Sequence, residues 1–417
     1  SILGSTGMDT TAVLLATCLA SFIGTMCMGL FANLPFALSA GMGLNAFFAY
    51  TVVGNMGYSW KIALLAVFIE GIIFLILSAT NVREALFNVI PMPLKQAVSV
   101  GIGVYIAFIG LQNAGVVVNH DSTLVTIVSF TENFRTTGIC ALLAIIGIII
   151  TAVLYVKNVK GFMLIGIFAT WILGIICQLT GLYVVDAQAG SVSLIPSFEM
   201  TDFSKLGKTF GECFNVDFDG VSIINFIVVI FSFLFVDIFD TLGTLIGVCT
   251  KADMLDKDGK LPAIKPALLA DSVATTAGAV LGTSTTTTFV ESSAGVAAGG
   301  RTGLSAVVTA VMFLISMLFA PIFIAIPSFA TAPALVICGF LMFSSITQIK
   351  FTEGNYLKSI PAYLCILAMP LFYSISEGIS IGIISYVLLH LICGKGKEVK
   401  PLMYVLAVLF ILKYIFL

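Results

Sequence analysis

The segment LGTSTTTTFVESSAGV, residues 281–296, decides the fold, because it places four consecutive threonines and Glu291 between two apolar runs. β-Branched hydroxyl residues disfavour a plain membrane helix, since their side chains offer the backbone competing hydrogen bonds. An ionisable side chain at membrane depth is costly, so it indicates a functional position. We predict that residues 281–287 are extended and that residues 288–299 form a half-helix with Glu291 near its start.

The rest of the chain is strongly apolar. Of its 417 residues, 59% are hydrophobic and 10% are charged, and the mean hydropathy is +1.13. A soluble chain of this length would need far more polar surface, so the composition indicates an integral membrane protein. The formal net charge is −2 without a basic block, which argues against a nucleic-acid partner. The nine cysteines lie singly, as is typical of small buried side chains.

Apolar runs long enough to cross about 30 Å of hydrocarbon recur throughout the chain. Two of them, 36–53 and 287–299, are short and follow approaches rich in Gly, Pro, Ser and Thr. The polar connection 185–220 is expected to be an external loop, and the last apolar segment, 402–417, either spans the membrane or lies along its surface. The predicted spans are 11–31, 36–53, 61–80, 95–114, 136–156, 161–184, 221–249, 265–282, 287–299, 303–325, 332–348, 359–374 and 378–393.

The chain also repeats itself. The segment LPFALSAGMGLNAFF, residues 34–48, has the same design as the threonine segment, with Pro35 and small residues before Asn45. Internal symmetry with corresponding interrupted segments indicates a transporter whose site lies at the repeat interface. Because 221–249 has no counterpart in the first half, the repeat predicts a further helix upstream of Ser1. The matched pairs include Asn45 with Glu291, Gly103 with Gly339, Ala20 with Ala274 and Gly24 with Gly278.

The two interrupted segments are expected to pair their strands and to aim both half-helices at one site. Extended backbone at membrane depth is tolerated only where it is paired or faces a cavity. The free N–H groups and the positive dipole end of each half-helix would then face that cavity.

A second acidic motif is FLFVDIFDTLGTLIG, residues 233–247, in which Asp237 and Asp240 lie three residues apart and so share one helix face. Asp240 is followed at once by Thr and then Leu-Gly, which allows a ligand to approach closely. Buried carboxyl groups of this kind can exchange a proton near neutral pH. A structural role, capping a broken helix or binding a neighbour's hydroxyl, stays open for both residues.

Other polar residues are weaker candidates. Glu70 lies in mid-span, where a helix hydroxyl is its expected partner, and Asp271 is interpreted as the cap of its span. His120 and His390 lie at span ends without metal-ligand partners. The sequence contains no HExxH or P-loop motif, so we expect no cofactor, no metal and no enzymatic activity.

At these residues the sequence closely resembles the AzgA-type purine permeases of the nucleobase–ascorbate/uracil permease superfamily. The segments that carry the resemblance are GMGLNAFFAYTVV (41–53), FLFVDIFDTLGTLIGV (233–248) and TSTTTTFVESSAGVAAGGRTGL (283–304). The resemblance implies an all-α polytopic fold of fourteen segments in two inverted repeats of seven, with the first helix missing here. A core domain (1–80 and 221–325) would move against a gate domain (81–184 and 326–417), with 185–220 as an extramembrane loop.

The resemblance further implies a multi-pass protein of the cell membrane that imports hypoxanthine, guanine or adenine with protons. By motif match, Asp240, Glu291 and Asn45 are its substrate-binding residues. Thr288, Phe289 and Phe47 are expected beside them, the two rings either stacking on the purine or packing between helices. Asp240, Glu291 and Asp237 are the expected proton-coupling residues. The expected partners are the purine, protons and lipid, and a homodimer stays open.

An anion exchanger or channel of the same inverted-repeat architecture is the alternative function. Such a site is expected to place a basic or neutral side chain opposite the half-helix tips. The sequence instead places Asp240 and Glu291 there, which favours a ligand that donates hydrogen bonds.

Overall fold

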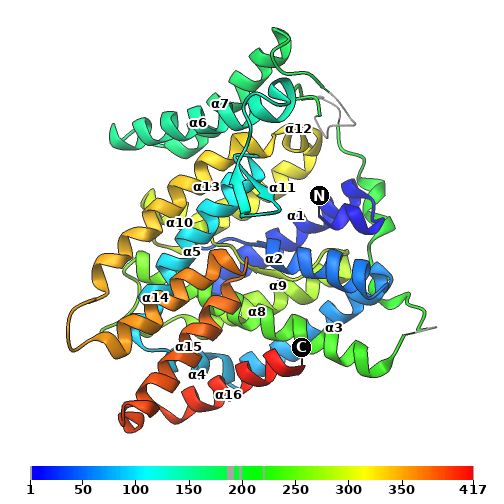
Figure 1. Cartoon of the computed structure of the whole chain (residues 1–417). Helices are drawn as coiled ribbons and strands as arrows, with labels where there is room; N and C mark the ends of the chain where they lie inside the picture. The colour runs from blue at the N-terminus through cyan, green and yellow to red at the C-terminus, as the bar shows by residue number, and fades with distance from the viewer. Residues whose placement is uncertain (1, 186–191, 197–199, 219–220, 417) are drawn as a thin grey trace. The chain divides into compact units, whose positions relative to one another are not determined.

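The computed structural model describes residues 2–185, 192–196, 200–218 and 221–416. It is mostly helical (Figure 1), and nine helices within those ranges are long and apolar enough to cross a membrane. The predicted fold class, a helical multi-pass membrane protein with short antiparallel strands, is confirmed. The helices are α1 Thr10–Cys27, α2 Met42–Ala46, α3 Trp60–Ala79, α4 Val82–Val89, α5 Met92–Asn113, α6 Ile139–Val156, α7 Phe162–Leu179, α8 Ile223–Lys251, α9 Ile264–Leu281, α10 Ser292–Ala297, α11 Gly303–Leu318, α12 Ala320–Ala325, α13 Ser328–Phe343, α14 Tyr356–Leu371, α15 Ile375–Ile392 and α16 Pro401–Phe416.

The chain forms two compact units. Unit 1 consists of Ser1–Ile102, Asp202–Leu318 and Ser345–Leu417, and unit 2 consists of Gly103–Thr201 and Phe319–Ser344. In unit 1, α1 packs on α9 and α11, and α3 packs on α8 and α9 (Figure 1). In unit 2, α13 packs on α6 and α7. The division into a core and a gate domain concerns movement and stays a prediction.

The predicted strand pairing is present in unit 1. Strand β1 (Leu38–Ala40) pairs antiparallel with β4 (Thr286–Thr288), and Ser39 lies opposite Thr287. Each strand leads into a short helix, β1 into α2 and β4 into α10. The half-helix of the second segment starts at Ser292 rather than at 288, because residues 286–288 remain in the strand.

Helices α1 and α9 cross closely at small residues. A Cβ added to Gly24 would collide with the Cβ of Ala274, and a Cβ added to Gly278 would lie 3.5 Å from the Cβ of Ala20. These four positions are the ones that the internal repeat matches, Gly24 with Gly278 and Ala20 with Ala274. The contact of Gly24 with Ala274 is therefore repeated by the contact of their counterparts, Gly278 with Ala20, which is the pattern that a twofold axis produces.

Two elements lie outside the predicted spans. Helix α4 has only eight residues, too few to cross a membrane, and it buries Arg83, Phe87 and Val89. The hairpin of β2 (Val117–His120) and β3 (Leu124–Ile127) in unit 2 is largely exposed. Neither element produces a long apolar run, so hydropathy alone does not detect them.

Candidate functional site

Asp240 lies beside the tip of the first half-helix. Gly41 is the N-cap residue of α2, and a Cβ built on Gly41 would lie 3.7 Å from Oδ2 of Asp240. A Cβ built on Gly43 would meet no atom within 4 Å, so space is open at this side of the first turn. Asp240 is half-buried. Its carboxylate is therefore placed to contact a ligand at the α2 tip.

Glu291 is the N-cap residue of α10, and its side chain makes no capping hydrogen bond. It is half-buried, and its charge lies close enough to that of Asp240 for the two to interact. The N–H groups of Ser292 and Ser293 donate to the carbonyls of Phe289 and Val290, at 3.1 and 3.0 Å. These two N–H groups of the α10 tip are therefore already hydrogen-bonded within the chain. The carboxylate of Glu291 is the polar group at this tip that is able to bind a ligand.

Asn45 connects the two interrupted segments. It lies in α2 and is half-buried, and its side-chain oxygen accepts a hydrogen bond from the hydroxyl of Ser284. Because the oxygen is occupied, the N–H₂ group is the end of the amide that is able to donate to a ligand.

Three further residues were expected near the tips. The Thr288 hydroxyl is buried and has no hydrogen-bond partner within the described ranges. Phe289 is half-buried, and its backbone N–H donates to the carbonyl of Ala37 at 2.8 Å. Phe47 packs edge-on against Phe233 of α8, with ring centroids 4.9 Å apart. The sequence leaves open whether the two rings stack on the purine or pack between helices. For Phe47, the structure gives a packing partner, Phe233.

A second group of charged side chains, which we call the inner cluster, consists of Glu70 (α3), Arg83 (α4), Asp237 (α8) and Asp271 (α9). All four are completely buried. Nη2 of Arg83 lies 2.8 Å from Oδ2 of Asp271, and the guanidinium lies over the ring of Phe74 at 4.1 Å from its centroid. The sequence suggested that Asp271 caps its helix, and this prediction is wrong. Asp271 lies inside α9, where it is the ion-pair partner of Arg83.

The threonine run ties strand β4 to the inner cluster. The hydroxyl of Thr285 donates to Oε2 of Glu70 at 3.0 Å, and the hydroxyl of Thr287 lies 2.7 Å from that of Thr241. Thr241 in turn lies 3.1 Å from both carboxylate oxygens of Asp271. Alternate residues of an extended segment point the same way, so Thr285 and Thr287 both face the acids. The run thus donates a hydroxyl directly to Glu70, and its hydroxyls reach Asp271 only through the hydroxyl of Thr241.

Asp237 and Asp240 lie on one helix but in different surroundings. Asp237 faces the inner cluster, where the Thr241 hydroxyl lies 3.3 Å from its Oδ1. Asp240, three residues further along α8, keeps part of its surface accessible beside the α2 tip. The two carboxylates thus differ in burial and in their hydrogen-bond partners, although the charge of Asp240 still acts on Asp237.

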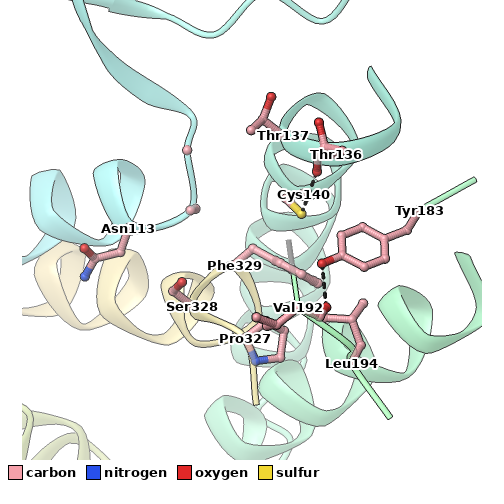
Figure 2. Close-up of a pocket in the computed structure, with 12 residues that line it drawn as sticks. Asn113, Thr136, Thr137, Cys140, Tyr183, Val192, Leu194, Pro327, Ser328 and Phe329 are labelled. Atoms are coloured by element: carbon pink, nitrogen blue, oxygen red, sulfur yellow. Dashed lines mark hydrogen bonds between the residues drawn. The ribbon is translucent and has the colours of Figure 1, made fainter. Parts of the chain in front are cut away.

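Unit 2 contains a cavity of about 230 Å³ (Figure 2). It lies beside the end of α5 and the start of α13, and the Tyr183 hydroxyl at its wall donates to the Val192 carbonyl at 2.7 Å. All twelve lining residues shown are uncharged. The cavity therefore lacks the acidic groups that the sequence indicates for the site. No group of three or more potential metal ligands occurs within the described residues.

Helices interrupted at membrane depth, with two carboxylates beside the half-helix tips, define the protein as a membrane transporter. The transmembrane domain of the cyanobacterial bicarbonate transporter BicA has the same fold. Its TM-score to this chain is 0.55 at 13% sequence identity, and the match covers 92% of this chain and 96% of that one. At this identity, the likeness concerns the fold alone.

Sequence comparison gives the family. The model of a permease family, that of the xanthine/uracil permeases, matches residues 1–390. The guanine/hypoxanthine permease PbuO of Bacillus subtilis is 44% identical over 99% of this chain and 91% of its own length. The adenine permease AdeP of Escherichia coli is 39% identical over 100% of this chain and 88% of its own. The chain belongs to this permease family, which confirms the predicted resemblance, and it is a multi-pass protein of the cell membrane.

Proposed function

We propose that the protein imports purine nucleobases (hypoxanthine, guanine or adenine) together with protons, by elevator-type alternating access. One observation carries the proposal: the half-buried carboxylates of Asp240 and Glu291 interact electrostatically, and Asp240 adjoins the α2 tip, where space is open beside Gly43. The names of the relatives PbuO and AdeP, which describe purine permeases, support the substrate class.

The chemistry of a purine suits these groups. A purine base presents N–H donors and ring acceptors on a flat apolar body. Asp240 and Glu291 accept its N–H groups, and Asn45 donates to its carbonyl or ring nitrogen. Charge-assisted hydrogen bonds of this kind are about twice as strong as neutral ones. The unpartnered Thr288 hydroxyl offers a further polar contact, and Phe289 offers a ring face.

Proton coupling follows from the cost of moving charge. An uncompensated carboxylate in a low-dielectric environment costs several kcal/mol. A proton on one acid of the set Asp240, Glu291 and Asp237 would reduce this cost when the loaded core crosses the barrier. Release of the proton on the cytoplasmic side would restore the charge and free the substrate.

An anion exchanger or channel of the same architecture is the alternative. The carboxylates of Asp240 at the α2 tip and of Glu291 at the start of α10 oppose it, because two negative charges repel an anion. In uptake assays, an anion transporter would take up labelled bicarbonate or sulfate and ignore purines. A purine permease would show the reverse.

The proposal is tested by uptake of labelled hypoxanthine into cells that produce the protein, with unlabelled purines as competitors. Glu291→Gln is expected to weaken purine binding about 10- to 150-fold, since a hydrogen bond to a charged group contributes about 1.5–3 kcal/mol. Glu353→Gln, which changes an exposed glutamate, is the matched control. Near wild-type uptake by Glu291→Gln would remove Glu291 from the site.

A further inference from the structure

We propose that Glu70 and Asp237 form a proton-carrying pair that is separate from the carboxylates at the half-helix tips. The pair shares one proton between Oε1 of Glu70 and Oδ2 of Asp237, and this is the proton that is moved with the substrate. The inference rests on proton-coupled purine import as the function of the protein, and it assigns the coupling proton to two particular atoms.

The first argument is that one carboxylate oxygen of Glu70 and one of Asp237 lack hydrogen-bond donors. Oε1 of Glu70 and Oδ2 of Asp237 are buried and have no hydrogen-bond partner within the described residues. Both side chains are completely buried, and their carboxyl groups lie within hydrogen-bonding reach of each other. Two ionised carboxylates in this position repel each other and leave both atoms unsatisfied. A proton on either oxygen turns it into a donor to the other, so one proton satisfies both atoms.

The second argument is the distribution of donors within the inner cluster. Asp271 receives the Arg83 guanidinium at 2.8 Å and the backbone N–H of Thr288 at 3.2 Å, so it is well satisfied as an anion. Glu70 receives the hydroxyl of Thr285, on the oxygen that faces away from the shared proton. Asp237 receives at most a share of the Thr241 hydroxyl, which also lies near Asp271. Asp271 is therefore the ionised member, and Glu70 with Asp237 is the pair that lacks donors.

The third argument is the balance of charge. The charged groups that act on the pair are Asp271 from α9, Arg83 from α4 and Asp240 from α8 itself. Arg83 is offset by Asp271, so no cation remains to offset two further anions. Taking up one proton forms one O–H bond and reduces the negative charge of the pair, from −2 to −1. Releasing the proton breaks that bond and restores the charge.

The pair is linked to the tips through the backbone. Thr285, which donates to Glu70, accepts the N–H of Gly41 on its carbonyl at 3.4 Å. Gly41 is the N-cap residue of α2 and adjoins Asp240. A change of charge at Glu70 therefore acts on the segment that positions the ligand, which is a physical route by which substrate and proton are coupled.

The test uses accumulation of a labelled purine in proteoliposomes with an imposed pH difference. If one proton moves with each base, the accumulation ratio of the wild-type protein changes about tenfold for each pH unit of difference. Glu70→Gln places a permanent amide donor opposite Asp237 and mimics the protonated pair. We expect this variant to bind and exchange purine, while its accumulation ratio stays near one at every pH difference. Asp237→Asn should behave in the same way, and Glu353→Gln should behave as the wild type.

The outcomes separate this inference from the proposed function. If the wild-type protein does not accumulate purine in response to a pH difference, proton-coupled import itself is wrong. If it does, and either Glu70→Gln or Asp237→Asn keeps the wild-type response, the shared proton is wrong. Loss of purine binding by a correctly folded variant would also overturn the inference, because it would make the pair part of the substrate site. Should one variant fail to fold, the other decides the result. If neither variant folds, the infrared spectrum of the wild-type protein tests the shared proton. The band of a protonated carboxyl group should disappear when purine transport releases the proton. A band that stays unchanged would overturn the inference.

Discussion

Two pairs of acidic side chains lie on the helices of unit 1, and their surroundings differ. Asp240 and Glu291 are half-buried and lie beside the half-helix tips. Glu70 and Asp237 are completely buried, and each carboxylate lies within hydrogen-bonding distance of a threonine hydroxyl. On the proposed function, accessibility rather than residue type decides what an acid is able to bind. An accessible carboxylate is able to accept the N–H groups of a ligand, whereas a completely buried pair exposes no surface to one.

The largest expected effect comes from breaking the ion pair beside the sealed acids. Arg83→Met leaves Asp271 buried without a cation, which costs about 3–5 kcal/mol of stability. We expect a clearly lower thermal unfolding temperature in detergent, and recovery of much of the loss in the double variant Arg83→Met, Asp271→Asn. The exposed Arg135 provides the control substitution, Arg135→Met. If Arg83→Met unfolds at the wild-type temperature, the ion pair does not stabilise the inner cluster.

The next effect separates the two acidic pairs directly. Asp240→Asn removes the charge from a carboxylate at the α2 tip and is expected to weaken purine binding about 10- to 150-fold. Its accumulation ratio should still respond to the pH difference, in contrast to that of Glu70→Gln. Equilibrium binding and accumulation in proteoliposomes measure the two properties independently. An Asp240→Asn variant with unchanged affinity, or with no response to pH, would erase the distinction between the pairs.

The smallest expected effect concerns Asp9, a carboxylate near the protein surface with which the buried acids can be compared. Asp9 caps α1, and the hydrogen bond from Lys208, at 2.8 Å, together with the backbone N–H of Ala12, holds the pKa of Asp9 below its usual range. Because the folded pKa is the lower one, this stabilisation is present above the unfolded pKa of about 3.9 and is lost as the pH falls through the folded value. We expect Asp9→Asn to cost less than about 1 kcal/mol at neutral pH. Thermal unfolding as a function of pH should show that difference shrinking in acid, and a pH-independent difference would contradict the ion pair.

Local patterns in the sequence were sufficient for the membrane class, the helical spans and the two interrupted segments. Apolar runs report on burial in lipid, and threonine or small residues report on extended backbone, so both are visible in short windows. The same windows marked Asp240, Glu291 and Asn45 as polar residues at membrane depth. The assignment of the fold class therefore needed no tertiary information.

The inner cluster was beyond such patterns. Arg83 is not marked by any local pattern, because the eight residues of α4 are too few to produce a hydropathy signal. The sequence predicts a helix cap at Asp271, the partner of Arg83, and a helix hydroxyl as the partner of Glu70, whereas Glu70 accepts the hydroxyl of Thr285 from an extended segment. Each of these contacts joins elements far apart in the chain. Which charge meets which is set by how the helices pack, and packing depends on all the elements at once.

The amino-acid order alone thus placed acids, an amide and threonines within the membrane-spanning part of the chain. Only the folded arrangement divided the acids into an accessible pair and a sealed pair, although Asp237 and Asp240 lie on one helix. The physical reason is that accessibility and hydrogen-bond partners belong to the neighbourhood of a side chain, and that neighbourhood is built from four helices and a strand. The order of residues specifies a side chain's chemistry, and its neighbours specify whether that chemistry serves a ligand or a proton.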